Sequence, residues 1–427
     1  MNIWLVKTGE PLPSDGKSVR LFRTGIFAKH LAANGHDVTW WSGTFDHQNK
    51  VQRNSETTFD ASLESVRILQ LKSDGYQKNI SLKRIIDHKQ VAKEFVHVAQ
   101  KEPIPDIILC AFPTIELCKA VITYSRNHDI PVLIDIRDLW PDTFVERLMP
   151  VSLQSVGKII VSPLAASVHK IMKQATGITS ISRPMLDWGL KYAKREIRNT
   201  DHVFPFGYTP KKLTPEQHNL AREFFKPLNT DSKAVDLRIC LFATLNNSFN
   251  VKTLIDAAKI LSEGDKNIQF VICGRGEKLE EFKVHSAGLE NFFFFGWVNF
   301  PTIQYLMQQS DIGVAPYINT SDFAISIPNK AVEYLSGGLP ILTSIEGHLT
   351  EILLENQCGW QYENDKPLSL SEIISNIAND KQKLALMQTN AKNLFESKFS
   401  AAKVYGNFMQ HLSNVVKFKH EQHYGNY

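Results

Sequence analysis

The stretch from Pro328 to Tyr334 combines residue types that can together bind a diphosphate and a sugar diol. Proline suits the first turn of a helix, because the N–H that it lacks would have no partner there. The free amides of Asn329 and the two residues after it would form an anion site, which the helix dipole favours and to which Lys330 adds a charge. Glu333 follows about one turn later. Its carboxylate can accept two hydrogen bonds from a vicinal diol such as a ribose.

A purely structural explanation of the same stretch stays open. Glu333 would then face solvent, and Gly337-Gly338 would be an ordinary helix stop, because glycine is common just after the last helical residue. Diphosphate followed by ribose is the order in a nucleotide sugar, so the functional alternative is a nucleotide-sugar site. Other segments of the chain must decide between the two.

A second candidate cluster follows the apolar run Val132–Ile136, which we expect to be a buried strand. Arg137 and Asp138 come directly after this run and should therefore emerge at the edge of a ligand cleft. There Asp138 is the candidate to orient or deprotonate a hydroxyl group, and Arg137 is the candidate to stabilise a phosphate. The alternative is that the two side chains form a structural ion pair.

The loop from Gly9 to Arg20 offers a third set of polar groups. Gly16 would let the backbone approach a phosphate or an acceptor, and Lys17 and Arg20 would add positive charge. The alternative is an exposed polar loop without ligand contacts. The loop lacks the first glycine of a P-loop, and no GxGxxG follows the first expected strand, which disfavours a nicotinamide enzyme.

Helices and strands must position these three clusters. Both halves of the chain show short apolar runs that alternate with amphipathic stretches. The strands expected in the first half are 3–6, 37–41, 66–71, 107–111, 132–136, 178–182 and 203–206. In the second half they are 239–243, 268–273, 292–295, 312–315 and 341–343. Expected helices include 20–34, 153–174, 251–262, 329–336 and a helical tail from 384 to 420. Apolar strands between helices predict α/β domains whose parallel sheets are covered on both faces.

A proline- and glycine-rich segment, 199–215, interrupts this series and predicts a hinge between two domains. We expect a first domain of residues 1–205 and a second of residues 206–398, with ligands at the carboxyl ends of the strands. A length of 427 residues fits two domains.

The composition, with 43% apolar and 22% charged residues, is that of a soluble globular protein. The net charge of +4 does not require nucleic acid as a partner, and we expect none. The five cysteines are scattered and form no CxxC or Cys/His cluster, which favours a reducing cytoplasm over a disulfide framework or a metal site. We expect neither a signal peptide nor an apolar run of the roughly 18 residues that span a membrane.

The stretch Ser326–Pro340 resembles the donor-binding helix of the family-four retaining glycosyltransferases. This family has the GT-B fold, in which two Rossmann-like, doubly wound domains face each other across a cleft. Further segments of the chain are similar to the family and come in its order. They are 243–245 and 253–258, which resemble the start of the second domain, the Gly-rich turn 273–277, and 310–316, 338–342 and 358–360.

The resemblance implies donor-binding roles for individual residues. The segment 295–298 resembles the one whose backbone meets the nucleobase, which implicates Trp297 and Val298. Arg275 belongs to the Gly-rich turn and is implied in holding the diphosphate, together with Lys330 and the helix start at Pro328.

Several positions depart from the usual family pattern. A histidine common after the fourth strand of the first domain is absent, and Ala111-Phe112-Pro113 stands in its place. Thr244 and Phe249 stand where many members have the arginine and the lysine that clamp the diphosphate. Ile325 stands where many members have the first of two glutamates, eight positions before the second. The resemblance therefore implies a diphosphate site in which Thr244 lines the donor without supplying a charge.

Asp135–Pro141 resembles a signature of one branch of this family, found in capsule and O-antigen assembly. The implied function is transfer of a hexose or N-acetylhexosamine from a nucleoside-diphosphate sugar, with UDP as the expected nucleotide. The implied acceptor is a saccharide or a polyprenyl-linked saccharide in surface polysaccharide synthesis. Retention of configuration and independence of metal are also implied. No cofactor is expected, because the nucleotide sugar is a substrate.

Two other functions stay open on the same fold: a hydrolysing sugar-nucleotide epimerase, and a non-catalytic partner subunit. The resemblance also implies that a C-terminal helix, 399–420, returns to the first domain.

The stretch 155–174 mixes aliphatic residues with Lys158, Lys170 and Lys173. It is either a buried amphipathic helix, the commoner case, or a peripheral membrane face suited to a lipid-linked acceptor. We expect a cytoplasmic protein that, in the second case, contacts the inner face of the cell membrane.

Overall fold

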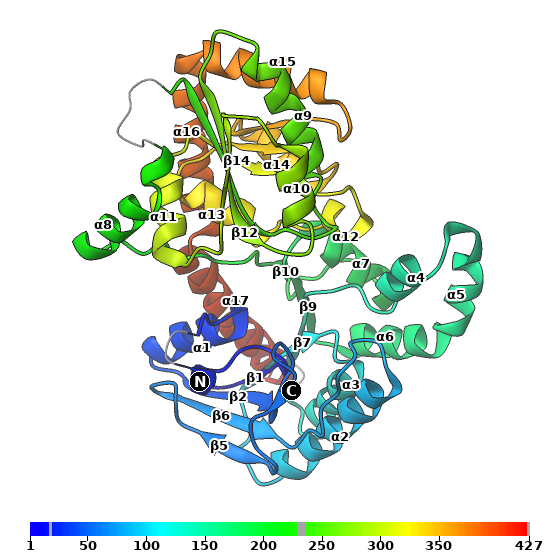
Figure 1. Cartoon of the computed structure of the whole chain (residues 1–427). Coiled ribbons are helices and arrows are strands. Elements are labelled where there is room, and N and C mark those ends of the chain that lie inside the picture. Colours follow the sequence, from blue (N-terminus) through cyan, green and yellow to red (C-terminus); the bar gives the residue numbers. More distant parts are fainter. Residues whose placement is uncertain (17–18, 229–234, 425–427) are drawn as a thin grey trace. The chain divides into compact units, whose positions relative to one another are not determined.

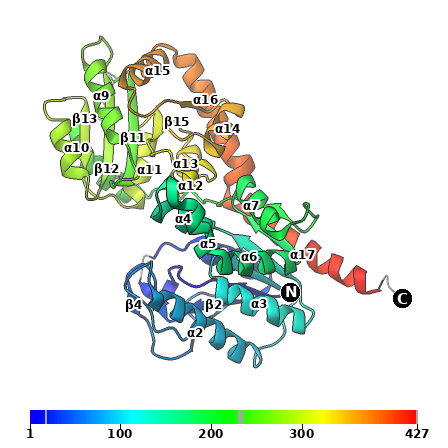
Figure 2. The same ribbon diagram turned by 90° about the vertical axis from the view of Figure 1, so that its right-hand side faces the viewer.

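The computed structural model describes residues 1–16, 19–228 and 235–424, and the chain forms two compact units. Unit 1 consists of Met1–Pro205 together with the chain from Val404 onward, and unit 2 consists of Phe206–Lys403. Each unit is a sheet with helices on both faces (Figure 1, Figure 2). The predicted fold class, α/β with parallel sheets, is confirmed.

Unit 1 is built on an eight-stranded sheet in the order β10-β9-β8-β7-β1-β2-β6-β5, parallel throughout except for the edge strand β5. The strands are β1 (Asn2–Val6), β2 (Asp37–Gly43), β5 (Thr58–Asp60), β6 (Val66–Leu71), β7 (Ile107–Phe112), β8 (Val132–Ile136), β9 (Gly177–Ser180) and β10 (His202–Val203). β7 and β8 are buried along their whole length, as strands covered on both faces must be. A separate two-stranded ribbon consists of β3 (Phe45–Asp46) and β4 (Val51–Gln52).

The helices of unit 1 cover both faces of this sheet (Figure 1). On one face, α3 (Ile115–Asn127) packs between α2 (Leu82–Ala99) and α6 (Ser162–Gln174). On the other, α1 (Arg23–Ala33) packs on the C-terminal helix α17 (Ala401–Tyr424), where the rings of Phe27 and Phe408 stack with centroids 4.6 Å apart. The remaining helices are α4 (Asp142–Leu148), α5 (Gln154–Ile160) and α7 (Arg183–Ala193).

The single helix predicted over 153–174 is wrong, because the chain forms two helices there, α5 and α6, with a break at Val161. Pro163 explains the break. It has no N–H to donate to the carbonyl of Ile159, and its ring would clash with that carbonyl. The predicted helical tail is likewise divided into α16 (Lys381–Leu394), a π-helical turn (Phe395–Phe399) and α17.

Unit 2 has a six-stranded, fully parallel sheet in the order β13-β12-β11-β14-β15-β16. The strands are β11 (Leu237–Thr244), β12 (Ile268–Arg275), β13 (Phe292–Phe295), β14 (Ile312–Ala315), β15 (Ile341–Thr343) and β16 (Gly359–Gln361). The helices are α8 (Pro215–Phe224), α9 (Val251–Ser262), α10 (Leu279–His285), α11 (Phe300–Gln308), α12 (Ser321–Ala324), α13 (Asn329–Ser336), α14 (His348–Glu355) and α15 (Pro367–Asn379), besides α16. Two hydrophobic cores cover the faces of the sheet, one shared with α9, α10 and α15 and one with α8, α11, α13, α14 and α16 (Figure 2).

Within the described ranges, no helix combines the length and the apolar character needed to cross a membrane.

Candidate active site

The strand order of unit 2 reverses between β11 and β14. From β11 the chain adds β12 and β13 on one side of the sheet, and then β14, β15 and β16 on the other. In open α/β sheets, ligands bind at such a reversal, beyond the carboxyl ends of the strands. The loops that follow β11 and β14 therefore define the candidate site.

Backbone hydrogen bonds hold these two loops together. Asn250 N donates to Pro316 O at 2.7 Å, and Ile318 N donates to Ser248 O at 2.9 Å. Between these bonds, Phe249 and Tyr317 form an isolated antiparallel bridge, and their ring centroids lie 4.7 Å apart. The pairing therefore places two aromatic rings beside each other at the point where the strand order reverses.

Helix α13 begins at the same place, and Pro328 is its N-cap residue, with φ −60° and ψ 141°. Ala331 N donates to Pro328 O at 2.9 Å, so the prediction that three amides are free at this helix start is wrong for Ala331. The amides of Asn329 and Lys330 make no backbone hydrogen bond to any described residue. Two N–H groups and the positive end of the helix dipole therefore remain for an anion.

Lys330 is buried against the aromatic pair of the two loops. Its Nζ lies 4.1 Å from the ring centroid of Phe249 and 5.2 Å from that of Tyr317, within cation–π range. Among the described residues, this Nζ has no hydrogen-bond partner. Burial lowers the pKa of Lys330 to about 7, although Glu333 acts to raise it. An anion at the helix start would supply the partner that the ammonium lacks.

Packing below the helix fixes its direction. Tyr334 is fully buried, and its hydroxyl reaches Cys240 O at 3.1 Å and Val314 O at 3.2 Å, which are carbonyls of β11 and β14. Gly313 makes room for this ring, because a Cβ at that position would collide with it. Glu333 lies beside Tyr334 and is also buried, which contradicts the alternative in which it faces solvent. The anion-binding end of α13 is thus held directly under the site.

The remaining predicted donor residues lie at the carboxyl ends of β11, β12 and β13. Thr244 is paired in register with Arg275, and the Arg275 guanidinium lies 5.8 Å from the ring centroid of Trp297. Gly274 has φ +146°, and a Cβ there would collide with the Ala243 carbonyl, so this turn requires glycine. Trp297 is 61% exposed, whereas the Val298 side chain belongs to the hydrophobic core. The edge therefore offers a cation and an exposed ring.

Unit 1 has a pocket of about 230 Å³ at the carboxyl ends of its own strands. Its strand order reverses between β1 and β7, and the pocket lies at this reversal, since Lys7 follows β1 and Pro113 follows β7. Arg137 and Asp138, which follow β8, also line it. The structure therefore brings the predicted Arg137–Asp138 cluster to a second candidate site.

Arg137 belongs to a buried charge network and not to a pair with Asp138. Its Nε donates to Asp135 at 2.8 Å, and its guanidinium also binds Glu10. Arg23 donates to the same Asp135 carboxylate at 3.1 and 3.2 Å. Burial alone would raise the pKa of Asp135, but Arg23 and Arg137 lower it to about 2. Two arginines and two carboxylates thus neutralise each other beneath the pocket.

Asp138 holds the loop that follows β8. Its carboxylate accepts hydrogen bonds from Leu139 N at 2.7 Å, Trp140 Nε1 at 3.1 Å and Thr143 Oγ1 at 3.2 Å. These bonds favour a positioning role for Asp138, which fixes Trp140 and the start of α4. A role as a base for an acceptor hydroxyl stays a prediction.

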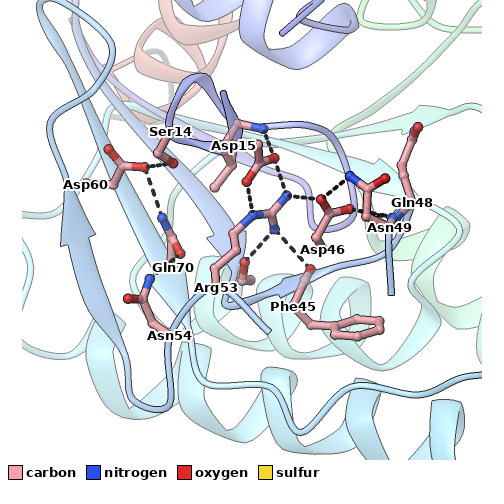
Figure 3. A network of polar contacts seen from close by, with 12 residues as sticks. Ser14, Asp15, Phe45, Asp46, Gln48, Asn49, Arg53, Asn54, Asp60 and Gln70 are labelled. Atoms are coloured by element: carbon pink, nitrogen blue, oxygen red, sulfur yellow. Dashed lines mark hydrogen bonds and ion pairs between the residues drawn. The ribbon is translucent and has the colours of Figure 1, made fainter. Parts of the chain in front are cut away.

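The loop that carries Gly16 is anchored by Arg53 (Figure 3). Arg53 makes a two-pronged contact with Asp15, at 2.6 and 2.7 Å, and donates to the carbonyls of Gly43 and Phe45. Gly16 is exposed, and a Cβ there would make only ordinary contacts, so the loop leaves it accessible.

The structure describes one of the two cations that were predicted in this loop. The side chain of Arg20 is exposed. Lys17 lies outside the described residues.

Comparisons with known proteins show which proteins this chain is similar to. Residues 236–380 match a protein family described as "Glycosyl transferases group 1". The matched residues lie within unit 2. A curated relative, the amylovoran biosynthesis glycosyltransferase AmsK of Erwinia amylovora, is 21% identical over 218 residues, which are 50% of this chain and 54% of that protein. The match therefore spans about half the length of the curated relative.

Solved structures resemble almost the whole chain. Sucrose-phosphate synthase from Thermosynechococcus elongatus is 14% identical, with a TM-score of 0.66 over 96% of this chain and 97% of that chain. HepE from Anabaena, solved with UDP and glucose, is 15% identical, with a TM-score of 0.62 over 97% and 100%. At these identities the likeness shows the fold, which is GT-B with two Rossmann-like units.

The structure shows the surroundings of the positions at which the sequence departs from the family-four pattern that it resembles. Phe249, in place of a clamp lysine, forms one wall of the aromatic pair around Lys330. The charge that the loop lacks is therefore present on the helix. Sequence reasoning expected the charge of Lys330 but missed its contact with the Phe249 ring, because the pairing of Phe249 with Tyr317 is a tertiary contact without a local signal.

Sequence reasoning also missed the cations of the unit 1 pocket outside the Arg137 cluster. Lys7 and Arg84 line it, from the end of β1 and from the first turn of α2. An arginine in the first turn of a helix opposes the helix dipole, and this is the one local signal that could have drawn attention to Arg84.

Proposed function

We propose that this protein is a glycosyltransferase that takes a sugar from a nucleoside-diphosphate sugar and transfers it to a saccharide or lipid-linked saccharide. The buried Lys330 ammonium carries the proposal. It lies at the start of α13, where the strand order reverses, and has no hydrogen-bond partner among the described residues. A diphosphate would satisfy this ammonium and the two free amides together.

The remaining donor contacts are proposed from the positions of neighbouring residues and from the family resemblance. Glu333, one turn along α13, would accept the ribose hydroxyls, and the exposed ring of Trp297 would lie near the nucleobase with the backbone of Val298. Arg275 and Thr244 would line the diphosphate from the ends of β12 and β11. UDP is the expected nucleotide, in line with the UDP that HepE of Anabaena was solved with.

During transfer, the bond between the anomeric carbon and the diphosphate breaks while an acceptor hydroxyl attacks that carbon and loses its proton. Negative charge develops on the leaving diphosphate. The amides of Asn329 and Lys330 and the Lys330 ammonium stabilise this charge before the bond has fully broken, so they lower the barrier. In this mechanism Asp138 or a neighbouring group receives the acceptor proton.

The finer assignments rest on the family resemblance. We propose retention of anomeric configuration, membership of family four, and a place in capsule or O-antigen synthesis; the Erwinia relative is named for the synthesis of amylovoran. The sugar would be a hexose or N-acetylhexosamine. We propose catalysis without a metal, because Lys330, Arg275 and the helix start supply positive charge at the diphosphate. Turnover that persists in EDTA, with a product whose anomeric proton shows retention by NMR, would support these assignments.

The donor site is tested by binding. A thermal-shift screen of UDP-, GDP- and other nucleotide sugars identifies the donor, and calorimetry then compares the wild type with K330M and E333Q. K330M should weaken donor binding tenfold or more, a loss of about 1.4 kcal/mol or more. E333Q should weaken the nucleotide sugar more than inorganic pyrophosphate, because the proposal places Glu333 at the ribose, whereas its effect on pyrophosphate acts only through the Lys330 pKa. K266M, an exposed lysine between α9 and β12, serves as the matched control.

The same experiment separates the alternatives. Unchanged donor affinity in K330M and E333Q would overturn the proposed site. Release of free nucleotide at full rate without any acceptor would identify an epimerase of the same fold. Tight donor binding without release or transfer would identify a non-catalytic partner subunit.

We also propose that a lipid-linked acceptor would bring the protein to a membrane surface through α5. The aliphatic side chains of Val156, Ile159 and Ile160 are 51%, 73% and 63% exposed, whereas the aliphatic residues of α6 that face the core are buried. In a flotation assay with anionic liposomes, the wild type should float and an I159S/I160S variant should stay at the bottom. A wild type that does not float would remove the membrane proposal and leave the donor proposal intact.

A further inference from the structure

The pocket of unit 1 gathers charged side chains at the reversal of its strand order. Three of its lining residues are cations, Lys7, Arg84 and Arg137, and two are carboxylates, Asp87 and Asp138. Its volume of about 230 Å³ is smaller than the roughly 300–1,000 Å³ of pockets that enclose a whole drug-sized ligand. It therefore suits one charged group with part of a sugar.

Both carboxylates of the lining are already occupied. Asp87 accepts hydrogen bonds from Ser73 Oγ at 2.5 Å and from Gly75 N at 2.8 Å, so it holds the loop after β6. Asp138 accepts its three hydrogen bonds within the loop after β8. Arg137 is neutralised by Asp135 and Glu10 beneath the pocket. The cations left to decide which ligand the pocket attracts are Lys7 and Arg84.

Burial lowers the pKa of Arg84, and the nearby Tyr76, Asp138 and Asp87 offset this only in part. Arg84 lies in the first turn of α2, where its own N–H donates to the N-cap Ser81 at 3.3 Å, and a cation there opposes the helix dipole. Its guanidinium packs over the rings of Trp140, at 4.4 Å, and Tyr76, at 5.3 Å. One N–H group donates to Asn79 O at 2.7 Å.

The Arg84 guanidinium interacts with Tyr76 but is not fully satisfied. Its Nε is buried without a hydrogen-bond partner, and no described carboxylate lies within ion-pair distance. Burial of an unpaired guanidinium N–H is unfavourable, and a bound oxyanion would relieve it. The contact with the Trp140 ring restricts the guanidinium, so the site is preorganised.

The pKa values of the lysine and the two histidines that line the pocket are lowered, by burial and by the positive charges around them. Burial, with Arg137 and Arg84 nearby, lowers the pKa of Lys7, although Glu10 acts to raise it. Burial, with Lys50, Arg84 and Lys7, lowers the pKa of His47 to about 4. Burial, with Arg84, Lys7 and His47, lowers the pKa of His88 to about 3. Both histidines are therefore neutral at pH 7.

We propose that this pocket binds an oxyanion, a phosphate or a carboxylate, carried by the acceptor, and that Arg84 and Lys7 are its principal ligands. The assignment rests on the proposed glycosyl transfer, for which unit 1 would supply the acceptor site. It narrows the acceptor to a saccharide that bears a negative charge near the hydroxyl to be glycosylated. A sugar phosphate, a lipid-linked diphosphate and a uronic acid share this chemistry.

Binding to the UDP-saturated protein tests the pocket apart from the donor site. With UDP in excess, the full chain is titrated calorimetrically with inorganic pyrophosphate, with glucuronate and with glucose as the uncharged reference. We expect pyrophosphate or glucuronate to bind and glucose not to. R84M, which keeps the length of the side chain but not its charge, should weaken the bound anion at least tenfold, and K7M should also weaken it.

Controls separate a lost contact from a disturbed fold. R84K restores the charge without the planar fork and should recover part of the affinity. K89M removes an exposed lysine from the same helix and should change nothing. Near-ultraviolet circular dichroism checks that R84M keeps the packing of Trp140. Pyrophosphate identifies a phosphate-bearing acceptor, and glucuronate identifies a carboxylate-bearing one.

Two outcomes would overturn the proposal: no anion binding beside UDP, or anion binding that R84M and K7M leave within twofold of the wild type. If UDP itself does not bind, the proposed donor site fails, and the pocket is then tested by the same titrations in K330M. The failure of one proposal is therefore distinguishable from the failure of the other.

Discussion

At the scale of single residues, Lys330 supplies a positive charge beside a position where the sequence departs from the family pattern. A phenylalanine at position 249 removes a cation from the loop after β11, but its ring accepts the Lys330 ammonium at 4.1 Å. The ring also takes part in burying this lysine, and burial lowers the Lys330 pKa to about 7. The charge proposed to meet a diphosphate is thus complete at acidic pH, partly lost at neutral pH and absent at alkaline pH.

This leads to a prediction on the pH dependence of donor binding. An anion binds the protonated ammonium, so donor affinity should be constant below about pH 6 and fall as the pH rises through 7 toward 9. The fall should approach tenfold per pH unit until it reaches the higher pKa of Lys330 in the complex. Calorimetry with the intact nucleotide sugar is the measurement, since its diphosphate has no proton that titrates in this range.

K330M serves as the control for this pH dependence. The variant should bind the donor weakly, and equally weakly from pH 6 to pH 9. A wild-type affinity that does not change with pH would contradict the assignment of the titrating charge to Lys330.

At the scale of elements, continuous apolar runs made the strands of both sheets predictable, except for the short edge strands β5 and β16. The run 268–273 lies within β12, and the expected 251–262 and 329–336 are the bounds of α9 and α13. The short pieces α4 and α14 and the ribbon β3–β4 were not predicted, because they are too brief to show a period. Pro163 indicated a helix break in the sequence, but the apolar spacing on both sides of it fits one continuous helix.

A candidate site could be predicted from the sequence where a single helix or strand carries all of its residues. Pro328, Lys330 and Glu333 share one helix, so their spacing alone pointed to a diphosphate and a ribose. The partners of Arg137 come instead from Glu10, in the loop after β1, and from Asp135, near the end of β8. Such a network depends on which strands are neighbours in the sheet, and no local pattern contains that information.

The buried network around Asp135 joins β8, α1, β9 and the loop after β1, and it leads to a stability prediction. D135N removes the charge that pairs Arg23 and Arg137 and should destabilise the protein by about 3–5 kcal/mol, because two arginines are left buried and underpaired. Urea unfolding at pH 7 is the measurement. D187N, which breaks an exposed pair with Arg183, should cost less than about 1 kcal/mol and serves as the control.

The pH dependence of stability gives the same prediction a second measurement. The Asp135 pKa is lowered from 3.8 to about 2, so its contribution to stability is complete above pH 4 and is lost as the pH falls toward 2. D135N should lack this part of the acid sensitivity. A loss below 1 kcal/mol at pH 7, with an unchanged acid limb, would contradict the network's role.

At the scale of the whole molecule, unit 1 is discontinuous in sequence. Its last helix, α17, follows almost all of unit 2 along the chain, yet its residues from Val404 onward belong to unit 1. Phe408 is fully buried and stacks on Phe27 of α1 and on Phe204, with centroids 4.6 and 4.1 Å apart. His411 lies in the same helix, 3.2 Å from the carbonyl of Thr200. The first unit is therefore complete only after the second has been synthesised.

This discontinuity predicts where a mutation in the last helix acts. F408A removes a ring from between Phe27 and Phe204 and should cost unit 1 about 3–5 kcal/mol, although residue 408 is nearly the last part of the chain. Hydrogen exchange followed by mass spectrometry should show faster exchange in β1, β2 and β7, with β11 and β12 unchanged. F408L, which keeps most of the buried volume, should show a smaller effect of the same kind. Equal loss of protection in the strands of both units would contradict the assignment of this helix to unit 1. Unchanged donor binding by F408A would confirm that the damage is confined to the other unit.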